Sequence, residues 1–213
     1  MAKISPSILS CDFSILKEDI DTVVKDVEYL HIDVMDGLFV NNISFGIPVI
    51  KSIRPHYDIL FDTHLMIVEP ERYIDAFASA GADLITFHIE ATKDSKNVID
   101  LIHAKGLKAG ISLRPKTHVL ELAPYLSMVE LVLVMSVEPG FGGQAFDSSA
   151  VDKIKWLKEQ KALHGYTYEI EVDGGINGET AKIVREAGAE VLVSGSYIFK
   201  AKNRKEAILS LNE

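Results

Sequence analysis

Short hydrophobic runs recur along the chain and are separated by stretches with the periodicity of amphipathic helices. We expect a strand at each run, which gives residues 4–9, 29–35, 59–66, 83–89, 108–113, 131–137, 168–172 and 191–195. Between them, apolar residues recur every three or four positions, as helices require, in stretches such as 14–27, 70–82, 95–106 and 148–165. Eight strands that alternate with helices predict an α/β fold, a single (β/α)8 TIM barrel over residues 1–213. A doubly wound open sheet is the alternative.

Polar side chains gather on one face of several predicted strands. Successive side chains of a strand point to opposite sides. In the second predicted strand, His31, Asp33 and Met35 therefore share a face and alternate with apolar residues. The same pattern collects Asp62, His64 and Met66, then Thr86, His88 and Glu90, then Glu169, Glu171 and Asp173. In a barrel this face points inward, and the polar groups are densest toward the carboxyl ends of the strands, where barrel active sites lie.

Two histidines and two aspartates of this inward face form a candidate metal site. His31, Asp33, His64 and Asp173 offer nitrogen and oxygen ligands without sulfur, which suits Zn(II), Fe(II), Mn(II) or Co(II). The alternative is that the two histidines are hydrogen-bonded core residues. We favour the metal, because both histidines bear the same relation to a strand end and each has an aspartate nearby. We therefore expect one divalent metal cation per subunit.

Glycine-rich segments follow the last three predicted strands. They are residues 137–144, 173–177 and 194–197. Glycine lets backbone N–H groups approach an anion closely, and loops at this end of a barrel often hold a phosphate. Turn formation alone would explain one such loop. Because three of them lie at neighbouring strand ends, a phosphate site and simple turns are equally good interpretations.

Charge and composition narrow the range of partners. The chain has 22 basic and 31 acidic residues, a net charge of −9 and no basic stripe, so we expect no nucleic-acid partner. An anionic substrate would be held by local dipoles rather than by the overall field. No apolar run approaches the roughly 18 residues that span a membrane. The single cysteine, Cys11, excludes an internal disulfide, and we expect a soluble cytoplasmic protein.

The motifs together resemble one known family. HIDVMDG, THLM, VEPGFGGQ, EVDGGIN and SGSYIF follow the opening SPSIL in the order and at the spacing seen in ribulose-phosphate 3-epimerase. The likeness extends over nearly the whole chain. It implies a (β/α)8 barrel that interconverts D-ribulose 5-phosphate and D-xylulose 5-phosphate in the pentose phosphate pathway with a divalent metal. It also implies a homo-oligomer, either a dimer or a hexamer.

The resemblance implies roles for individual residues. His31, Asp33, His64 and Asp173 would bind the metal, and Asp33 and Asp173 would exchange the proton at C3 through an enediolate. Ser7, His64 and Asp173 would contact the sugar. The remaining substrate-binding residues would be Gly140, Phe141, Gly142, Gly143, Gly174, Gly175, Gly195 and Ser196, and the methionines Met35, Met66 and Met135 would line the active site.

Some positions leave questions open. The chain departs from the usual family pattern at Asn41, Thr63, Arg114 and Glu138, none of which is a proposed ligand or base. Arg114 stands at a strand end, so it bears on which sugar is accepted. His88 and Glu90 face inward, and support of the metal ligands and a purely structural network are equally open for them.

Three other functions compete with the pentulose-phosphate epimerase. A hexulose-phosphate 3-epimerase, such as one acting on allulose 6-phosphate, would share the metal and the aspartates. A sugar-phosphate decarboxylase or aldolase of similar shape would need Asp-x-Lys-x-x-Asp, whereas no lysine follows Asp33 before Asp36. An inactive sugar-phosphate-binding barrel would lack one of the two carboxylates, and both are present.

Overall fold

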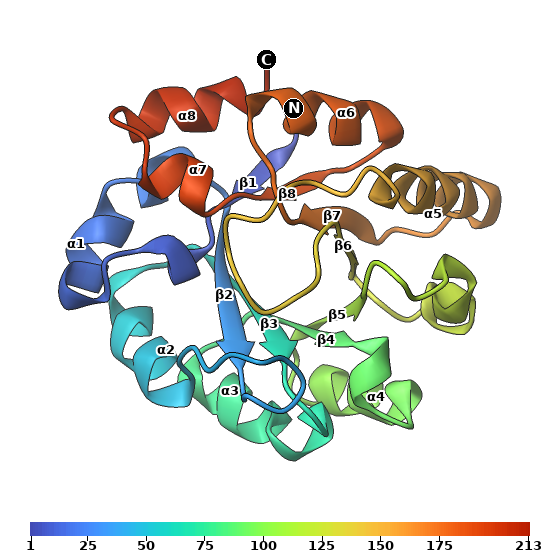
Figure 1. Cartoon of the computed structure of the whole chain (residues 1–213). Helices are drawn as coiled ribbons and strands as arrows, with labels where there is room; N and C mark the ends of the chain where they lie inside the picture. The colour runs from blue at the N-terminus through green and yellow to red at the C-terminus, as the bar shows by residue number, and fades with distance from the viewer.

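The chain folds into a barrel of eight parallel strands surrounded by helices (Figure 1). The computed structural model describes all of residues 1–213. The strands are β1 Lys3–Ser5, β2 Tyr29–Met35, β3 Leu60–Met66, β4 Leu84–His88, β5 Lys108–Leu113, β6 Leu131–Met135, β7 Glu169–Asp173 and β8 Val191–Val193. From β2 onward each strand pairs with the next in sequence, and β8 pairs with β1. This order confirms the predicted barrel and excludes the doubly wound sheet.

The seam between β1 and β2 is closed by a single bridge. Ser7 pairs in parallel with His31, and the His31 backbone N–H donates to Pro6 O at 3.0 Å. The first predicted strand ends early, at Ser5, because Pro6 has no N–H for the ladder. The chain then turns through a 3₁₀ helix at Ile8–Ser10. As a result, Ser7 stands directly beside β2.

Helices cover the outside of the barrel in sequence order. They are α1 Leu16–Asp21, α2 Ile47–Ile53, α3 Ile74–Ala80, α4 Ser95–Ala104, α5 Ala150–His164, α6 Gly178–Ala187, α7 Ser196–Phe199 and α8 Arg204–Ser210. Between β5 and β6 a 3₁₀ helix, Val119–Tyr125, takes the place of an α-helix, and Pro124 lies within it. None of the helices has the length and apolar character needed to cross a bilayer.

The two faces of the strands pack as their alternation predicts. Leu30, Ile32 and Val34 of β2 belong to the large apolar core shared with the helices. Truncation of a fully buried residue such as Ile32 to alanine typically costs about 2–5 kcal/mol. Inside the barrel, a smaller apolar cluster includes Tyr29 and Leu131 at the beginnings of their strands. The polar inward residues are thereby displaced toward the carboxyl ends.

Candidate active site

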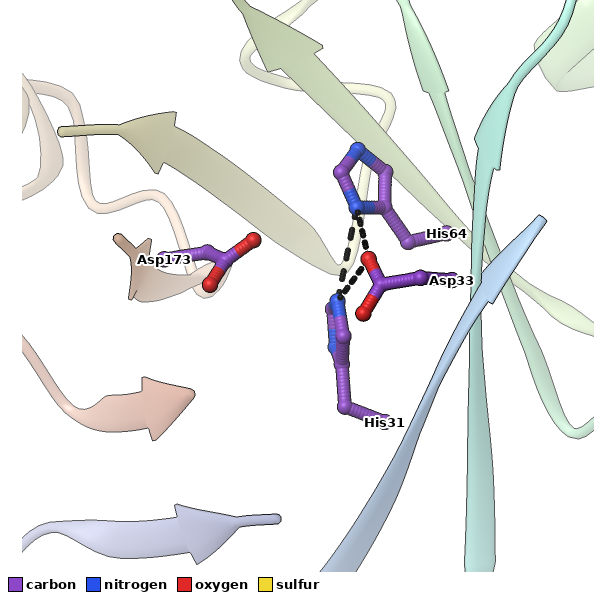
Figure 2. Close-up of side chains that lie close together, drawn as sticks. All are labelled: His31, Asp33, His64 and Asp173. Carbon is purple, nitrogen blue, oxygen red and sulfur yellow. Dashed lines mark hydrogen bonds and ion pairs between the residues drawn. The ribbon is translucent and has the colours of Figure 1, made fainter. Parts of the chain in front are cut away.

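Neighbouring strands β2 and β3 bring three of the four predicted metal ligands together. In the parallel register Asp33 is paired with His64, and His31 is two residues earlier on the same face. Asp33 Oδ1 lies 3.3 Å from His31 Nε2 and 3.1 Å from His64 Nδ1. The two nitrogens are 3.4 Å apart (Figure 2). All three side chains are buried.

The fourth predicted ligand, Asp173, approaches from the other side of the barrel. It is the last residue of β7, and its carboxylate faces the three β2 and β3 side chains without an ion pair to them (Figure 2). One ligand atom from each of His31, Asp33, His64 and Asp173 lies within 4.8 Å of the others. Two imidazole nitrogens and two carboxylate oxygens at this spacing fit Zn(II), Fe(II), Mn(II) or Co(II). Without a cation between them, the two carboxylates would repel each other.

Hydrogen bonds orient two of these predicted ligands, His31 and Asp33. His31 Nδ1 lies 2.5 Å from Asp62 Oδ2, which leaves Nε2 directed at the site. Ser7 Oγ donates to Asp33 Oδ2, so the other oxygen of Asp33 faces the histidines. Such outer contacts fix the ring orientation and the proton position of metal-binding side chains. Ser7 is thus placed at the predicted site, where it positions Asp33.

Burial opposes ionisation of both aspartates, but their surroundings separate them. With no cation bound, the charge of His31 and hydrogen bonds from His31 and His64 outweigh burial at Asp33 and hold its pKa well below its usual value. At Asp173, burial and the charge of Asp33 raise the pKa to about 6. The two carboxyl groups therefore differ in proton affinity, as a base and its partner acid must.

A cavity of about 510 Å³ opens above Asp33 and Asp173. It extends toward the loops that follow β6, β7 and β8, and the loop after β6 crosses the mouth of the barrel (Figure 1). His64 is predicted to contact the sugar, but it is fully buried and does not line this cavity. The other predicted substrate-binding residues do line it: Ser7, Gly140, Phe141, Gly142, Gly143, Asp173, Gly174, Gly175, Gly195 and Ser196.

Methionines form an apolar part of the cavity wall. Met35 and Met66 are paired in register at the ends of β2 and β3, and both are buried beside Val40. Met135 is the last residue of β6 and is paired in register with Asp173. All three methionines line the cavity. Their side chains are apolar and polarisable, and they limit the room for water near the aspartates.

The turn after β7 can be made only with glycine. Gly174 has φ +122°, and an added Cβ would lie 2.6 Å from a Val137 side-chain carbon and 2.9 Å from its backbone nitrogen. Gly175 has φ +65°, and its added Cβ would lie 2.5 Å from Phe146 N. The turn after β7 therefore packs directly against the segment after β6. This contact explains why glycine is required at positions 174 and 175 even without a bound ligand.

Sequence reasoning missed a cation at the cavity's far end. Lys200 follows α7 and is the only lysine or arginine among the residues that line the cavity. It forms no ion pair within the chain. Its position four residues after Ser196 could have revealed it, because residues four apart on a helix lie on the same side.

Arg114, the departure that bears on substrate choice, is not at the cavity. Its guanidinium lies 4.0 Å from the centre of the Phe39 ring and donates to Phe39 O at 2.6 Å. The side chain is used to hold the segment after β2. The structure thus removes the reason to expect that Arg114 contacts the sugar.

Comparisons with known proteins agree with this geometry. The model of the ribulose-phosphate 3 epimerase family matches residues 3–199. A ribulose-phosphate 3-epimerase of Bacillus subtilis is 48% identical over 98% of this chain and 97% of its own. One from Schizosaccharomyces pombe is 42% identical over 99% of this chain and 92% of its own. A solved structure, that of KGPDC from Streptococcus mutans, has a TM-score of 0.75 at 15% identity, covering 100% of this chain and 96% of that one. At that identity the likeness shows the fold alone.

Proposed function

The chain belongs to the ribulose-phosphate 3-epimerase family, and on this premise we propose that it interconverts D-ribulose 5-phosphate and D-xylulose 5-phosphate. The observation that carries the proposal is the placement of Asp33 and Asp173. They reach one space from two sides, with two histidines beside them. An isomerase that inverts a carbon centre needs this two-sided arrangement, whereas an enzyme that removes a proton and returns it on the same face needs only one group.

Proton exchange at C3 is assigned to the two aspartates. Epimerisation removes the proton from the carbon next to the C2 ketone and returns a proton on the opposite face. In one direction Asp33, which its surroundings keep ionised, is the group that accepts the proton. Asp173, whose pKa is raised to about 6, is the group that donates. The roles exchange in the reverse direction, and general acid–base catalysis of this kind typically contributes 10²–10⁴-fold.

We propose that His31, Asp33, His64 and Asp173 hold one divalent cation per subunit. When bound, it supplies Lewis-acid stabilisation of the negative charge that develops on the sugar oxygens. The protein's own contribution is to keep the four donors within 4.8 Å of one another and to keep the surrounding wall apolar. The methionines of that wall would exclude water from the carbon that loses its proton.

The far end of the cavity is proposed to hold the phosphate. The glycine segments after β6 and β7, with Gly195 and Ser196 after β8, leave the backbone accessible there. Lys200 provides the one positive side chain of the cavity wall. In a chain of net charge −9, a local cation of this kind is needed to offset the repulsion of a phosphate dianion.

The wider setting is proposed as follows. Residues 1–213 fold as one domain, and the protein acts as a homo-oligomer, a dimer or a hexamer, in the pentose phosphate pathway of the cytoplasm. Support for the cytoplasm comes from a relative, the cytoplasmic isoform of ribulose-phosphate 3-epimerase from Oryza sativa, which is 44% identical to this chain. Support for the pathway comes from the sugar phosphates that the proposed reaction connects. Light scattering during size-exclusion chromatography measures the oligomeric state.

A single reaction in D₂O tests the proposed activity. The purified, metal-loaded protein is incubated with D-ribulose 5-phosphate, and the products are followed by NMR. We expect D-xylulose 5-phosphate with deuterium at C3 and no loss of carbon. Absence of C3 exchange would reject the epimerase. Allulose 6-phosphate is tested in parallel, and a higher kcat/KM with that sugar would instead support the hexulose-phosphate 3-epimerase.

A further inference from the structure

The outer nitrogen of His64 is occupied by another histidine. His64 Nε2 lies 2.8 Å from Nε2 of His88, which is the last residue of β4. Both rings are fully buried, and their centroids are 5.0 Å apart. Because His64 Nδ1 faces the proposed cation, its lone pair must be free there, so the proton of His64 sits on Nε2. His64 then donates to His88, and His88 accepts with Nε2.

This arrangement also places the proton of His88. A neutral imidazole that accepts with Nε2 carries its hydrogen on Nδ1. His88 Nδ1 lies 3.3 Å from Glu90 Oε2, although it is not aligned for a well-formed hydrogen bond. The contact is therefore chiefly electrostatic, and it favours the proton on Nδ1. No polar group of the chain forms a well-aligned hydrogen bond with that nitrogen.

Glu90 is itself fixed in place. It lies beyond the end of β4, on the 3₁₀ turn Ile89–Ala91, and not on the predicted strand. Its Oε1 accepts from the backbone N–H of Arg114 at 2.8 Å and from Thr117 Oγ1 at 2.5 Å. These two contacts leave Oε2 directed at His88. The carboxylate is thus anchored to the segment after β5.

The ring of His88 is held from a third direction. The Phe39 ring covers it with a centroid distance of 4.8 Å and an angle of 43°. Arg114 in turn lies over Phe39 and donates to its carbonyl oxygen. His88 therefore accepts a hydrogen bond from His64 at Nε2, faces the Glu90 carboxylate at Nδ1 and packs its ring against Phe39. Little freedom remains for it to rotate.

We propose that His88, oriented by Glu90, is a positioning residue that fixes the ring orientation and the proton position of His64 for cation binding. The inference rests on the proposed metal site, which it deepens. The fixed order is Glu90, His88, His64 and then the cation, with each group setting the proton position of the next. A purely structural role for His88 would not require that its hydrogen-bond partner be a proposed metal ligand, His64.

The first test compares metal affinities by chelator competition with Zn(II). His88→Leu removes the acceptor, and we expect a 10–100-fold loss of Zn(II) affinity, the usual effect of losing an outer contact of a ligand. His88→Gln keeps a side-chain acceptor and should recover part of that loss. His103→Gln is the matched control, because His103 forms a 3.0 Å pair with Glu130 on the exposed surface. Its Zn(II) affinity should be that of the wild type.

Thermal unfolding of the metal-free and Zn(II)-loaded proteins separates positioning from folding. A positioning role predicts that the metal-dependent rise in Tm shrinks in His88→Leu, in step with the weaker affinity, and returns in part in His88→Gln. A folded His88→Leu protein with wild-type Zn(II) affinity would overturn the inference. If the wild type itself binds no cation, the proposed metal site fails, which is a different outcome from a wild type that binds and variants that are unaffected.

A second measurement needs no substitution. In the Zn(II)-loaded wild type, ¹⁵N NMR of the histidine rings should show hydrogen on Nε2 of His64. It should also show a scalar coupling across the hydrogen bond between His64 Nε2 and His88 Nε2. A spectrum in which His64 carries its hydrogen on Nδ1, or in which this coupling is absent, would overturn the inference even where His88→Leu does not fold.

Discussion

Asp33 and Asp173 stand on strands that are not neighbours, yet each places a carboxylate oxygen within 4.8 Å of the other across the barrel mouth. Asp33 is buried and Asp173 is partly buried, and two carboxylates at this distance are unfavourable unless a proton or a cation lies between them. The same closeness makes them suitable for acting on opposite faces of one carbon. The short distance between the two carboxylates thus supports both the proposed proton transfer and the proposed cation.

Replacement of Asp173 by asparagine should abolish epimerisation while leaving the cavity in place. Asparagine keeps the shape of the side chain but cannot donate or accept the catalytic proton. We expect kcat to fall by about 10²–10⁴-fold. Steady-state turnover measures the loss, and inhibition by inorganic phosphate shows whether the far end of the cavity is intact. Turnover equal to the wild type would remove Asp173 from the mechanism.

Cation affinity should weaken as the pH falls. Burial and the charge of Asp33 raise the pKa of Asp173 to about 6. Burial lowers the pKa of His31, but the charges of Asp62 and Asp33 outweigh it and raise that pKa well above its usual value. A cation must displace these protons, so acidification favours the metal-free form. Zn(II) affinity measured at several pH values from about 7.5 to 5.5 should decline steadily by about tenfold or more per unit. An affinity that is constant over this range would contradict the assignment.

Loss of the Lys200 charge should weaken substrate capture without changing the chemical step. Lys200→Ala removes the only cation of the cavity wall, so we expect KM to rise about tenfold, or about 1.4 kcal/mol, with kcat little changed. The dependence of kcat/KM on salt should also become shallower. Lys202→Ala is the control, since Lys202 is exposed and does not line the cavity. Equal KM values in the two variants would show that Lys200 does not meet the phosphate.

A methyl group at Gly174 should destabilise the protein. Gly174→Ala introduces a Cβ at φ +122°, 2.6 Å from Val137, whereas Gly106→Ala has a positive φ of +73° with nothing within 4 Å. Both variants carry backbone strain, but only the first carries a clash, which typically adds about 1–3 kcal/mol. Chemical denaturation of the two variants gives the difference in free energy of unfolding. Equal stabilities would mean that the turn after β7 can move away from Val137.

Much of the fold could be predicted from the alternation of hydrophobic runs and amphipathic stretches along the chain. The bounds of β2 and β5 agree with their predicted runs, because each is a nearly continuous buried segment with clear ends. The 3₁₀ helix Val119–Tyr125 between β5 and β6 was not specified, since apolar spacing alone does not separate it from an α-helix. The predicted helix at 14–27 is also shorter, with α1 ending at Asp21 and a 3₁₀ turn at Val24–Asp26.

The candidate site could be predicted from the alternation of side chains along each strand and from the strand ends, but the contacts around its predicted ligands could not. His31 and Asp33 share a face of one strand by geometry alone, and the barrel then brings in the proposed ligands of β3 and β7. The contact between His64 and His88 depends on the register of β3 against β4, where His64 is paired with Thr86. No pattern in the sequence gives that register. Likewise, the position of Arg114 at a strand end does not reveal that its guanidinium packs on the Phe39 ring.

The most direct test of the four-ligand site is removal and return of the cation. The purified protein is stripped with a chelator, and metal content and epimerase activity are measured as Zn(II), Mn(II), Fe(II) or Co(II) is added back. We predict an inactive stripped protein whose activity returns in proportion to occupancy and saturates at one cation per chain. Full epimerase activity in protein shown by elemental analysis to contain no metal would contradict the account.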